Sequence, residues 1–362
     1  AIALVFNATS NSTIGRCDIG VYRTFSGYFD DEGWWGVAWL KAYHLTKRTE
    51  YLKRSRAVFD DLVTRSWSEA SCGGGFCWQA SKDPADMKAC YKNSITNELG
   101  LTLAAQLALT YHGLGMKSDF AHTLGWARKE LAWFKRSGLV NASYLVNDGL
   151  DTFTNHYEVC MNNGNEAYTY NQGVILSGLA YMWQLQRQDS SADLQLATRI
   201  IDSVFSNRSH LTYSGTHILR EMDEVPHLPI ENLYGGSPGT DGLQFKSIFV
   251  RHLMYFIQVV LSDESAAEIV RSAGGDVKQW QHYVEENADS IWMRAACVQD
   301  QPFSVGTSLV VPPLFGYRFG GPCSWAFGGP TATTQTAAID VFIAAAASMY
   351  ESNQHQYHGL LP

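Results

Sequence analysis

The chain has 362 residues, 46% of them hydrophobic, so it can bury the core of one large domain or of two ordinary ones. Its formal net charge of −8 argues against a nucleic-acid partner, because phosphate binding needs a concentrated basic surface. No uninterrupted apolar run approaches the roughly eighteen residues that a membrane-spanning helix needs.

The chain opens on an apolar run at residues 1–6 with no basic residue before it. This does not resemble an intact signal peptide, so we expect a processed or truncated N-terminus. Apolar residues then recur with a helical period from Trp34 to Leu62, broken at residues 44–48. Further helices are expected at 94–112, 118–136, 171–187, 191–206, 244–261, 277–294 and 334–350.

Short breaks alternate with long loops between these helices. The long loops, which contain Trp, Tyr and Cys rather than the Ser, Pro and Glu of linkers, are 72–92, 137–169, 209–241 and 298–333. This alternation predicts a series of helical hairpins whose irregular loops gather at one end, in a single domain over residues 1–362. The expected fold class is all-α, a toroid of helical hairpins. A helical solenoid is the alternative, although no fixed sequence period supports it.

Sequons and cysteines indicate the compartment. Asn-x-Ser/Thr sequons, which are used on secreted proteins, begin at Asn7, Asn11, Asn141 and Asn207. We therefore expect an N-glycosylated protein that is extracellular or in a cell wall. The 7 cysteines contain no CxxC pair, and their odd number allows up to three disulfides and leaves one thiol, with the pairing open.

The first candidate for chemistry is the acidic run Asp30-Asp31-Glu32, which stands where a loop enters a helix. Carboxylates at this place cap free N–H groups and complement the helix dipole, and one would suffice for that role. Several together repel one another unless some pKa values rise. A retaining glycosidase uses such a pair, with carboxyls roughly 5 to 5.5 Å apart.

The residues around this run carry a resemblance. The segment 30–43, DDEGWWGVAWLKAY, resembles the hallmark of glycoside hydrolase family 76, which comprises the endo-α-1,6-mannanases and fungal wall proteins of the Dfg5/Dcw1 type. Four more segments are similar to family motifs in the same order: CGGGFCW at 72–78, YKNSITNEL at 91–99, YTYNQGVIL at 168–176 and DGLQFKSIFVR at 241–251. The similarity extends from about residue 30 to about residue 350.

The resemblance implies an (α/α)6 barrel and a retaining mechanism without a metal or an organic cofactor. It implies that Asp30 is the nucleophile and Asp31 the general acid/base of a secreted endo-α-1,6-mannosidase. The expected partner is an α-1,6-mannan or another mannose-containing glycan, and we expect a monomer. Two alternatives stay open: a cell-wall transglycosidase acting on mannose-containing GPI glycans, and a non-catalytic mannan-binding wall protein.

The same motifs supply candidate substrate-binding residues, namely Trp34, Trp78, Asn93, Asn97, Tyr170, Asn171, Gln172, Phe245 and Lys246. Most have a structural alternative. Trp78 fits a sugar platform or the packing of its Gly-rich loop. Asn93 and Asn171 also fit helix caps, and Asn97 fits satisfaction of a loop backbone. Lys246 fits either the orientation of a carboxylate or a solvated surface lysine.

The chain departs from the family pattern in two places. Residues 1–29 are too few for the two helices that usually precede the Asp-Asp segment, so we expect a ring that is incomplete or remodelled at the N-terminus. Ser247 stands where the family motif has Gly. The C-terminus lacks a GPI-anchor pattern, which favours a secreted hydrolase over an anchored transglycosidase. The His residues show no clustered ligand set, and no Gly-x-Ser-x-Gly elbow is present.

Overall fold

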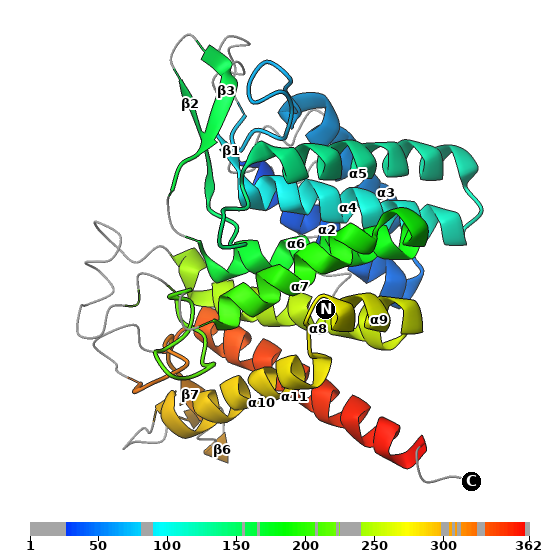
Figure 1. The fold of residues 1–362 in the computed structure, drawn as a ribbon. Helices are drawn as coiled ribbons and strands as arrows, with labels where there is room; N and C mark the ends of the chain where they lie inside the picture. Colours follow the sequence, from blue (N-terminus) through cyan, green and yellow to red (C-terminus); the bar gives the residue numbers. More distant parts are fainter. Residues whose placement is uncertain are drawn as a thin grey trace. The chain divides into compact units, whose positions relative to one another are not determined.

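The computed structural model describes residues 27–80, 90–153, 156–164, 167–206, 209–221, 224, 240–297, 304–305, 308–309, 313–323 and 330–358. Within them the chain is mainly α-helical, and short strands lie in the connections between helices (Figure 1). The expected remodelling of the N-terminal helices concerns residues outside this part of the chain, apart from 27–29.

The helices agree with the periodicity of the sequence, with ends shifted by a few residues. They are α2 (Phe29–Thr46), α3 (Thr49–Asp61), α4 (Ser94–Gly113), α5 (Lys117–Ser137), α6 (Thr169–Leu185), α7 (Ser191–Phe205), α8 (Phe245–Leu261), α9 (Glu264–Ser272), α10 (Val277–Arg294) and α11 (Ala332–His358). The short π-helix η2 spans Leu62–Ser66, and the 3-10 helices η4 and η6 span Arg187–Asp189 and Thr240–Gln244. Helix α9 was not expected, and α11 runs past residue 350.

The long connections carry strands that the sequence did not indicate. They are β1 (Lys92–Asn93), β2 (Gly149–Phe153), β3 (His156–Asn162), β4 (Ala296–Cys297), β5 (Ser304–Val305), β6 (Ser308–Leu309) and β7 (Leu314–Phe315). β1, β2 and β3 form one antiparallel sheet, in which Lys92 pairs with Leu150 and Leu150 with Asn162. β4 pairs with β7, and β5 with β6.

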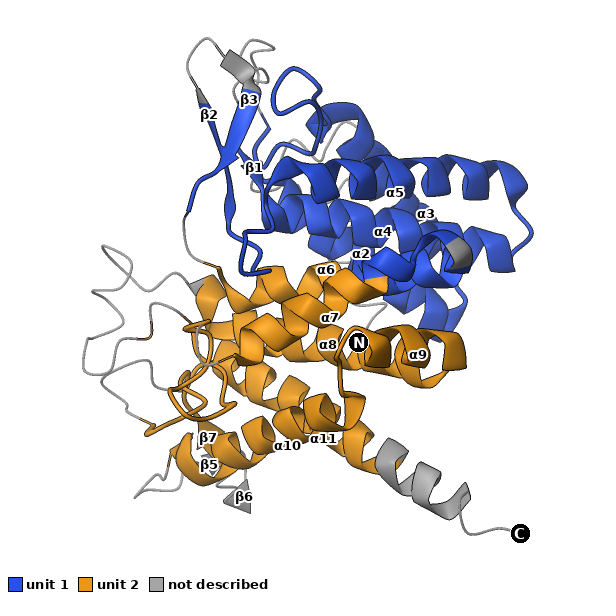
Figure 2. Ribbon diagram, in the orientation of Figure 1, with its two compact units in different colours: residues 1–166, 177–193 blue, residues 167–176, 194–362 orange. Residues whose placement is uncertain are grey.

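The chain divides into two compact units, coloured in Figure 2: residues 1–166 with 177–193, and residues 167–176 with 194–362. In unit 1, α4 packs against α2, α3 and α5. In unit 2, α11 packs against α8 and α10. Helices α6 and α7 each contribute to both units. The expectation of a single domain over residues 1–362 stays a prediction.

Helix α4 forms the centre of unit 1, and almost every one of its side chains is buried. Polar side chains of α4 are buried as well: Ser94, Glu98, Thr102, Gln106 and Thr110 recur at every fourth position and form a polar stripe along one side of the helix. Small residues permit the close approach. A Cβ on Gly36 of α2 would lie 2.5 Å from Leu103, and one on Gly100 of α4 would lie 2.3 Å from Phe76.

Cysteine pairing is settled for the described residues. Disulfides join Cys72 to Cys160 and Cys77 to Cys90 in unit 1, and Cys297 to Cys323 in unit 2. Cys17 lies outside the described residues, as do the sequons at Asn7, Asn11 and Asn207. Asn141 is half-buried, and its amide nitrogen donates to Oδ1 of Asn147 across 2.7 Å.

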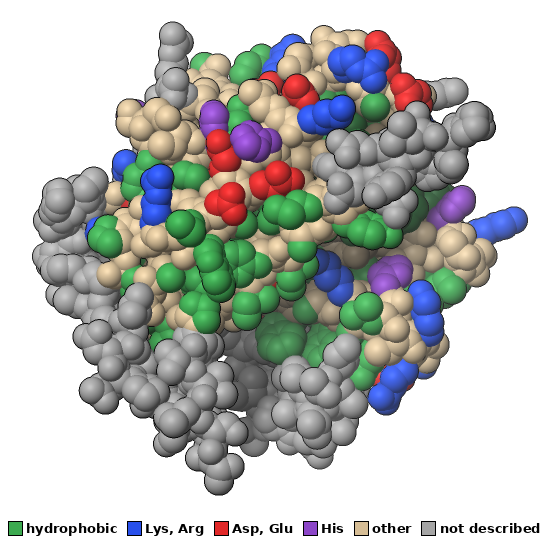
Figure 3. Space-filling model, turned by 90° about the horizontal axis from the view of Figure 1, so that it is seen from below, with side chains coloured by type: hydrophobic (Ala, Val, Ile, Leu, Met, Phe, Trp, Pro, Cys, Tyr) green, Lys and Arg blue, Asp and Glu red, His purple; other side chains and the backbone are tan. Residues whose placement is uncertain are grey.

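The described surface has a broad hydrophobic area on the face seen in Figure 3, next to a group of acidic side chains. Exposed large apolar residues include Trp292 and Met293 on α10, and Ile339 and Ile343 on α11. None of the helices that the structure describes is long and apolar enough to cross a bilayer.

Candidate active site

Helix α2 begins at the acidic run. Its first turn contains Asp30, Asp31 and Glu32, whose charges complement the helix dipole. The preceding Tyr28 is extended and makes no side-chain cap. Instead, the backbone N–H of Asp31 donates to Oδ1 of Asp30 across 3.0 Å. Asp30 therefore satisfies one of the free N–H groups of the first turn, although it lies within the helix.

Asp30 is half-buried, whereas Asp31 beside it is exposed. The indole N–H of Trp78 donates to Oδ2 of Asp30 across 3.0 Å, so each oxygen of Asp30 accepts one N–H. Burial and, after it, the charge of Asp31 together raise the pKa of Asp30 to about 6, although the N–H donors act in the opposite direction. Asp30 can thus change its protonation state close to neutral pH.

Trp78 is held on both sides of its backbone. Its N–H donates to the carbonyl of Tyr91 across 2.9 Å, and its carbonyl accepts the N–H of Phe29 across 2.8 Å. The ring of Tyr28 lies 4.6 Å from the indole, and the ring of Tyr91 meets it edge-on at 6.0 Å. These contacts fix the direction in which the indole N–H points.

Glu32 belongs to the core of unit 1. Its side chain is buried and accepts a hydrogen bond from Arg65 across 3.2 Å. Arg65 also pairs with Asp61, through a bond of 2.7 Å from Nε to Oδ1. Burial raises the pKa of Glu32, and the neighbouring carboxyl of Asp61 adds to this effect. The acidic run is thus split between an exposed, a half-buried and a buried carboxyl.

Asn93 and Asn97 make the structural contacts that were the alternatives to substrate binding, a helix cap and a bond to a loop backbone. Asn93 caps α4 by accepting the N–H of Thr96 across 3.3 Å. Asn97 is fully buried, and its Oδ1 accepts the N–H of Phe76 across 2.6 Å. The Nδ2 of Asn97 donates to the carbonyls of Phe76 and Asn93, at 3.1 and 2.7 Å. The Asn97 amide thus holds the Gly-rich loop against the start of α4, and the Asn93 amide caps that helix.

Trp34 is half-buried on α2, four residues after Asp30 and therefore on the same side of that helix. Asp30, Asp31, Trp34, Trp78, Asn93 and Asn97 all lie in unit 1. The other candidates, Tyr170, Asn171, Gln172, Phe245 and Lys246, lie in unit 2.

In unit 2, Tyr170 at the start of α6 stacks on Phe245 at the start of α8. Their ring centroids are 3.8 Å apart and the planes differ by 4°. Both rings are half-buried, and Tyr168 meets Phe245 edge-on at 5.4 Å. A flat aromatic pair of this kind offers a face for the C–H groups of a sugar.

The two amides beside Tyr170 are fully buried. Gln172 donates to the carbonyl of Tyr168 across 3.0 Å. The side-chain oxygen and nitrogen of Asn171 have no hydrogen-bond partner among the described residues. Asn171 therefore does not cap α6 through any bond to this part of the chain.

Lys246 is fully buried, so the alternative of a solvated lysine is wrong. Its ammonium pairs with Glu224 and lies 3.7 Å from the ring centroid of Tyr317. Glu224 also accepts the hydroxyl of Tyr213 across 2.8 Å and the N–H of Glu221 across 3.0 Å.

Glu221 in turn ties this pair to helix α6. It accepts the backbone N–H of Thr169 across 3.1 Å and also the Thr169 hydroxyl. Burial raises the pKa of Glu221 to about 8, while the charge of Lys246 acts in the opposite direction. The carboxylates Glu221 and Glu224 thus join the first turn of α6 to the first turn of α8.

Sequence reasoning did not find these supporting residues. Glu221, Glu224, Tyr213 and Tyr317 lie in connections without a periodic pattern. Lys92, which is also buried, stands inside a recognised motif but was not singled out. No three His, Cys, Asp or Glu side chains within the described ranges are grouped as metal ligands would be.

Comparison with known proteins adds the family. Residues 19–304 match the model of glycosyl hydrolase family 76. The chain is 29% identical over 239 residues to the mannan endo-1,6-alpha-mannosidase DCW1 of Saccharomyces cerevisiae, which covers 64% of this chain and 46% of that protein. The chain spans about half the length of the curated relatives it matches.

Solved structures agree on the fold. Dfg5 of Chaetomium thermophilum, in complex with glucosamine, has a TM-score of 0.65 at 16% identity, covering 96% of this chain and 75% of that one. The α-1,6-mannanase of Salegentibacter sp. HEL1_6 has a TM-score of 0.63 at 21% identity, covering 89% and 77%. An inactive variant of that mannanase, with two consecutive aspartates changed to asparagine, was solved with α-1,6-mannotriose. These likenesses confirm the expected class, an all-α (α/α)6 toroid of helical hairpins.

Proposed function

Because the chain belongs to glycosyl hydrolase family 76, we propose that it is a retaining endo-α-1,6-mannosidase in which Asp30 and Asp31 are the catalytic pair. The observation that carries the proposal is the environment of Asp30, half-buried beside exposed Asp31 and held by the Trp78 indole. The mannotriose complex of the inactive mannanase variant supports the same substrate class.

In the proposed mechanism Asp30 attacks the anomeric carbon, and the C–O bond to the leaving sugar breaks as Asp31 protonates its oxygen. Asp31 then removes a proton from water, which releases mannose from Asp30 and restores both carboxyls. The N–H groups on the two oxygens of Asp30 stabilise its carboxylate, which suits a nucleophile. The exposure of Asp31 suits a base that must meet water.

The substrate would be an α-1,6-mannan backbone outside the cell or in a cell wall. The three disulfides of the described residues support an oxidising compartment. The stacked rings of Tyr170 and Phe245 are the aromatic face in unit 2 that we assign to mannose.

Purified protein incubated with unbranched α-1,6-mannan should release short oligosaccharides whose first-formed reducing ends are α-anomers, as NMR would show. Asp30→Asn and Asp31→Asn should abolish release, whereas Asp289→Asn, at an exposed position on α10, should not. Products longer than the substrate, or joined to an added acceptor, would show transfer instead of hydrolysis. A folded protein that binds mannan without turnover, and equally well as Asp30→Asn, would contradict the proposal.

The roles within the pair can be separated with an aryl α-mannoside whose leaving group needs no proton. Asp31→Asn should form the glycosyl-enzyme rapidly from this substrate, because protonation is no longer required. Asp30→Asn should not, because the nucleophile is absent. The reverse result would exchange the two roles.

A further inference from the structure

We propose that Lys92 is a positioning residue for this reaction: its buried ammonium fixes the loop 68–78 so that the Trp78 indole donates to Asp30. The inference rests on the proposed function for its catalytic meaning, and on the contacts of unit 1 for its geometry.

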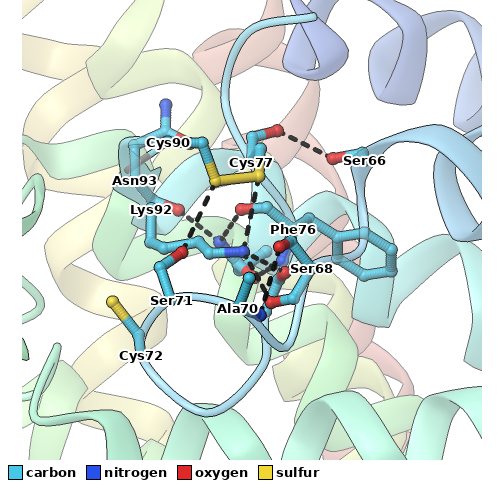
Figure 4. The surroundings of a disulfide bond; sticks show 12 residues. Ser66, Ser68, Ala70, Ser71, Cys72, Phe76, Cys77, Cys90, Lys92 and Asn93 are labelled. Carbon is cyan, nitrogen blue, oxygen red and sulfur yellow. Dashed lines mark hydrogen bonds between the residues drawn. A yellow bond between two sulfur atoms is a disulfide. The ribbon is translucent and has the colours of Figure 1, made fainter. Parts of the chain in front are cut away.

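The ammonium of Lys92 is directed into the loop. Nζ donates to the carbonyl of Gly75 across 2.5 Å and to that of Ser68 across 3.1 Å, and it lies 3.5 Å from Sγ of Cys77. Figure 4 shows the side chain passing close to the Cys77–Cys90 disulfide toward these acceptors. An ammonium has three donors, and all three meet the same loop.

The backbone of this loop follows a left-handed course that favours glycine. Cys72, Gly73, Gly74 and Gly75 all have positive φ, at 53°, 62°, 135° and 88°. Side chains of α5 satisfy two of its carbonyls: Trp133 donates to that of Cys72 across 2.9 Å and Arg136 to that of Gly73 across 3.2 Å. The ammonium of Lys92 serves the last of the four, Gly75, together with Ser68. A Cβ on Gly75 would lie 2.4 Å from the ring of Trp133, so glycine is required there.

Burying the lysine ammonium at this position costs free energy. Lys92 is completely buried, and burial lowers its pKa to about 7, while the carboxyl of Glu130 acts in the opposite direction. Glu130 is itself buried and has no hydrogen-bond partner among the described residues. An apolar side chain would fill the same space without that penalty. We therefore attribute the lysine at this position to the hydrogen bonds that its ammonium makes with the loop.

The loop transmits this order to Asp30. Only Tyr91 separates Lys92 from Cys90, whose disulfide partner Cys77 directly precedes Trp78. The backbone of Cys77 donates to Ser66 across 2.9 Å. Loss of the ammonium removes the Nζ donor from the carbonyls of Ser68 and Gly75, of which Gly75 still accepts the N–H of Ser68 across 3.1 Å, and so loosens the segment that directs the indole.

The test uses Lys92→Met, Trp78→Phe and the double variant of the whole chain. In 15N-tryptophan-labelled protein, the indole peak absent from Trp78→Phe identifies Trp78. In the wild type this peak should shift with pH as Asp30 titrates, and Asp30→Asn should remove the shift. Asp31 is the other ionisable group that acts on Asp30, so the same titration is recorded for Asp31→Asn.

In Lys92→Met we expect the Trp78 peak to lose this response. The Trp133 peak should move as well, because its indole N–H donates to the Cys72 carbonyl of the same loop, while indole peaks from outside unit 1 stay in place. The acidic limb of kcat/KM should move to higher pH by about one unit, because Asp30 loses a donor to its charged form. Trp78→Phe should give the same displacement, and the double variant should go no further. A merely structural role would lower Tm and the active fraction at every pH without moving the limb.

An unaltered Trp78 titration in folded Lys92→Met, or additive displacements in the double variant, would overturn the proposal. If Lys92→Met does not fold, Lys92→Leu replaces it with the same two outcomes, because it also removes every donor that Lys92 gives the loop. A wild type with the indole titration but without turnover would refute the proposed function and leave the Lys92–Trp78–Asp30 relationship intact.

Discussion

The indole N–H of Trp78 donates to Oδ2 of Asp30 across 3.0 Å, although the two residues lie 48 positions apart in the chain. The bond opposes the burial and the Asp31 charge that raise the pKa of Asp30. The balance sets the pH above which Asp30 is a carboxylate. A nucleophile must be ionised, so the balance also sets the pH range of the reaction.

We predict that kcat/KM on α-1,6-mannan oligosaccharides falls below about pH 6, by about tenfold for each further pH unit, because protonated Asp30 cannot attack. The loss is not acid unfolding through this group. A carboxyl whose folded pKa is raised contributes stability that is present at low pH and lost as pH rises through the folded value. Tm measured alongside should therefore not follow the activity. An acidic limb near pH 4 would show that burial does not act on Asp30.

The stacked rings of unit 2 give a prediction about binding. Tyr170→Ala removes one ring of the pair with Phe245 and should raise KM about fivefold with little change in kcat, which corresponds to about 1 kcal/mol of stacking. Tyr170→Phe should keep the wild-type KM if the ring face is what matters. Tyr350→Ala, at an exposed position on α11, is the control. An equal loss in kcat and kcat/KM would instead assign Tyr170 to the transition state.

The buried pair of Lys246 and Glu224 gives a prediction about stability. Lys246→Met leaves Glu224 as an uncompensated buried carboxylate, so the free energy of unfolding at pH 7 should fall by about 3 to 5 kcal/mol. Adding Glu224→Gln should recover part of the loss, because it removes that charge. Urea denaturation measures both. Lys278→Met, on the exposed side of α10, should change the free energy of unfolding little. A similar loss in this variant would show that the burial of Lys246 is not the cause of its effect.

Periodicity predicted most of the helices because helices that bury one face repeat every 3.6 residues. It missed α9, which has only 9 residues, although Asp263 supplies a cap by accepting the N–H groups of Ser265 and Ala266. It also missed β2 and β3, since their pairing depends on a sheet formed with β1.

The motifs named candidate residues for the site, and among them the structure shows Trp78 bonded to Asp30, a contact that the sequence did not indicate. The sequence left open whether Asn97 contacts a ligand or a loop, and its amide bonds to Phe76 come from a tertiary approach. The same holds for Lys246, whose partner Glu224 lies 22 residues earlier in an irregular connection. Roles that depend on such approaches have no local signature.

Two glycines within helices give a paired prediction. A Cβ on Gly173 of α6 would lie 2.5 Å from the backbone Cα of Phe249, whereas a Cβ on Gly125 of α5 would meet no atom within 4 Å. Gly173→Ala should therefore lower the free energy of unfolding by about 1 to 3 kcal/mol, because the backbone of α8 must shift. Gly125→Ala should raise it by up to about 1 kcal/mol, since alanine favours helix.

Urea denaturation of both variants at one pH measures these changes. Both variants replace a helical glycine by alanine, so a difference between them reports on the neighbouring atoms. Gly173→Ala should also displace the first turn of α8, which carries Phe245, and so raise KM more than Gly125→Ala does. Stabilisation of both variants would show that α6 and α8 have room to separate, and that the approach of Gly173 to Phe249 is not what holds Phe245 against Tyr170.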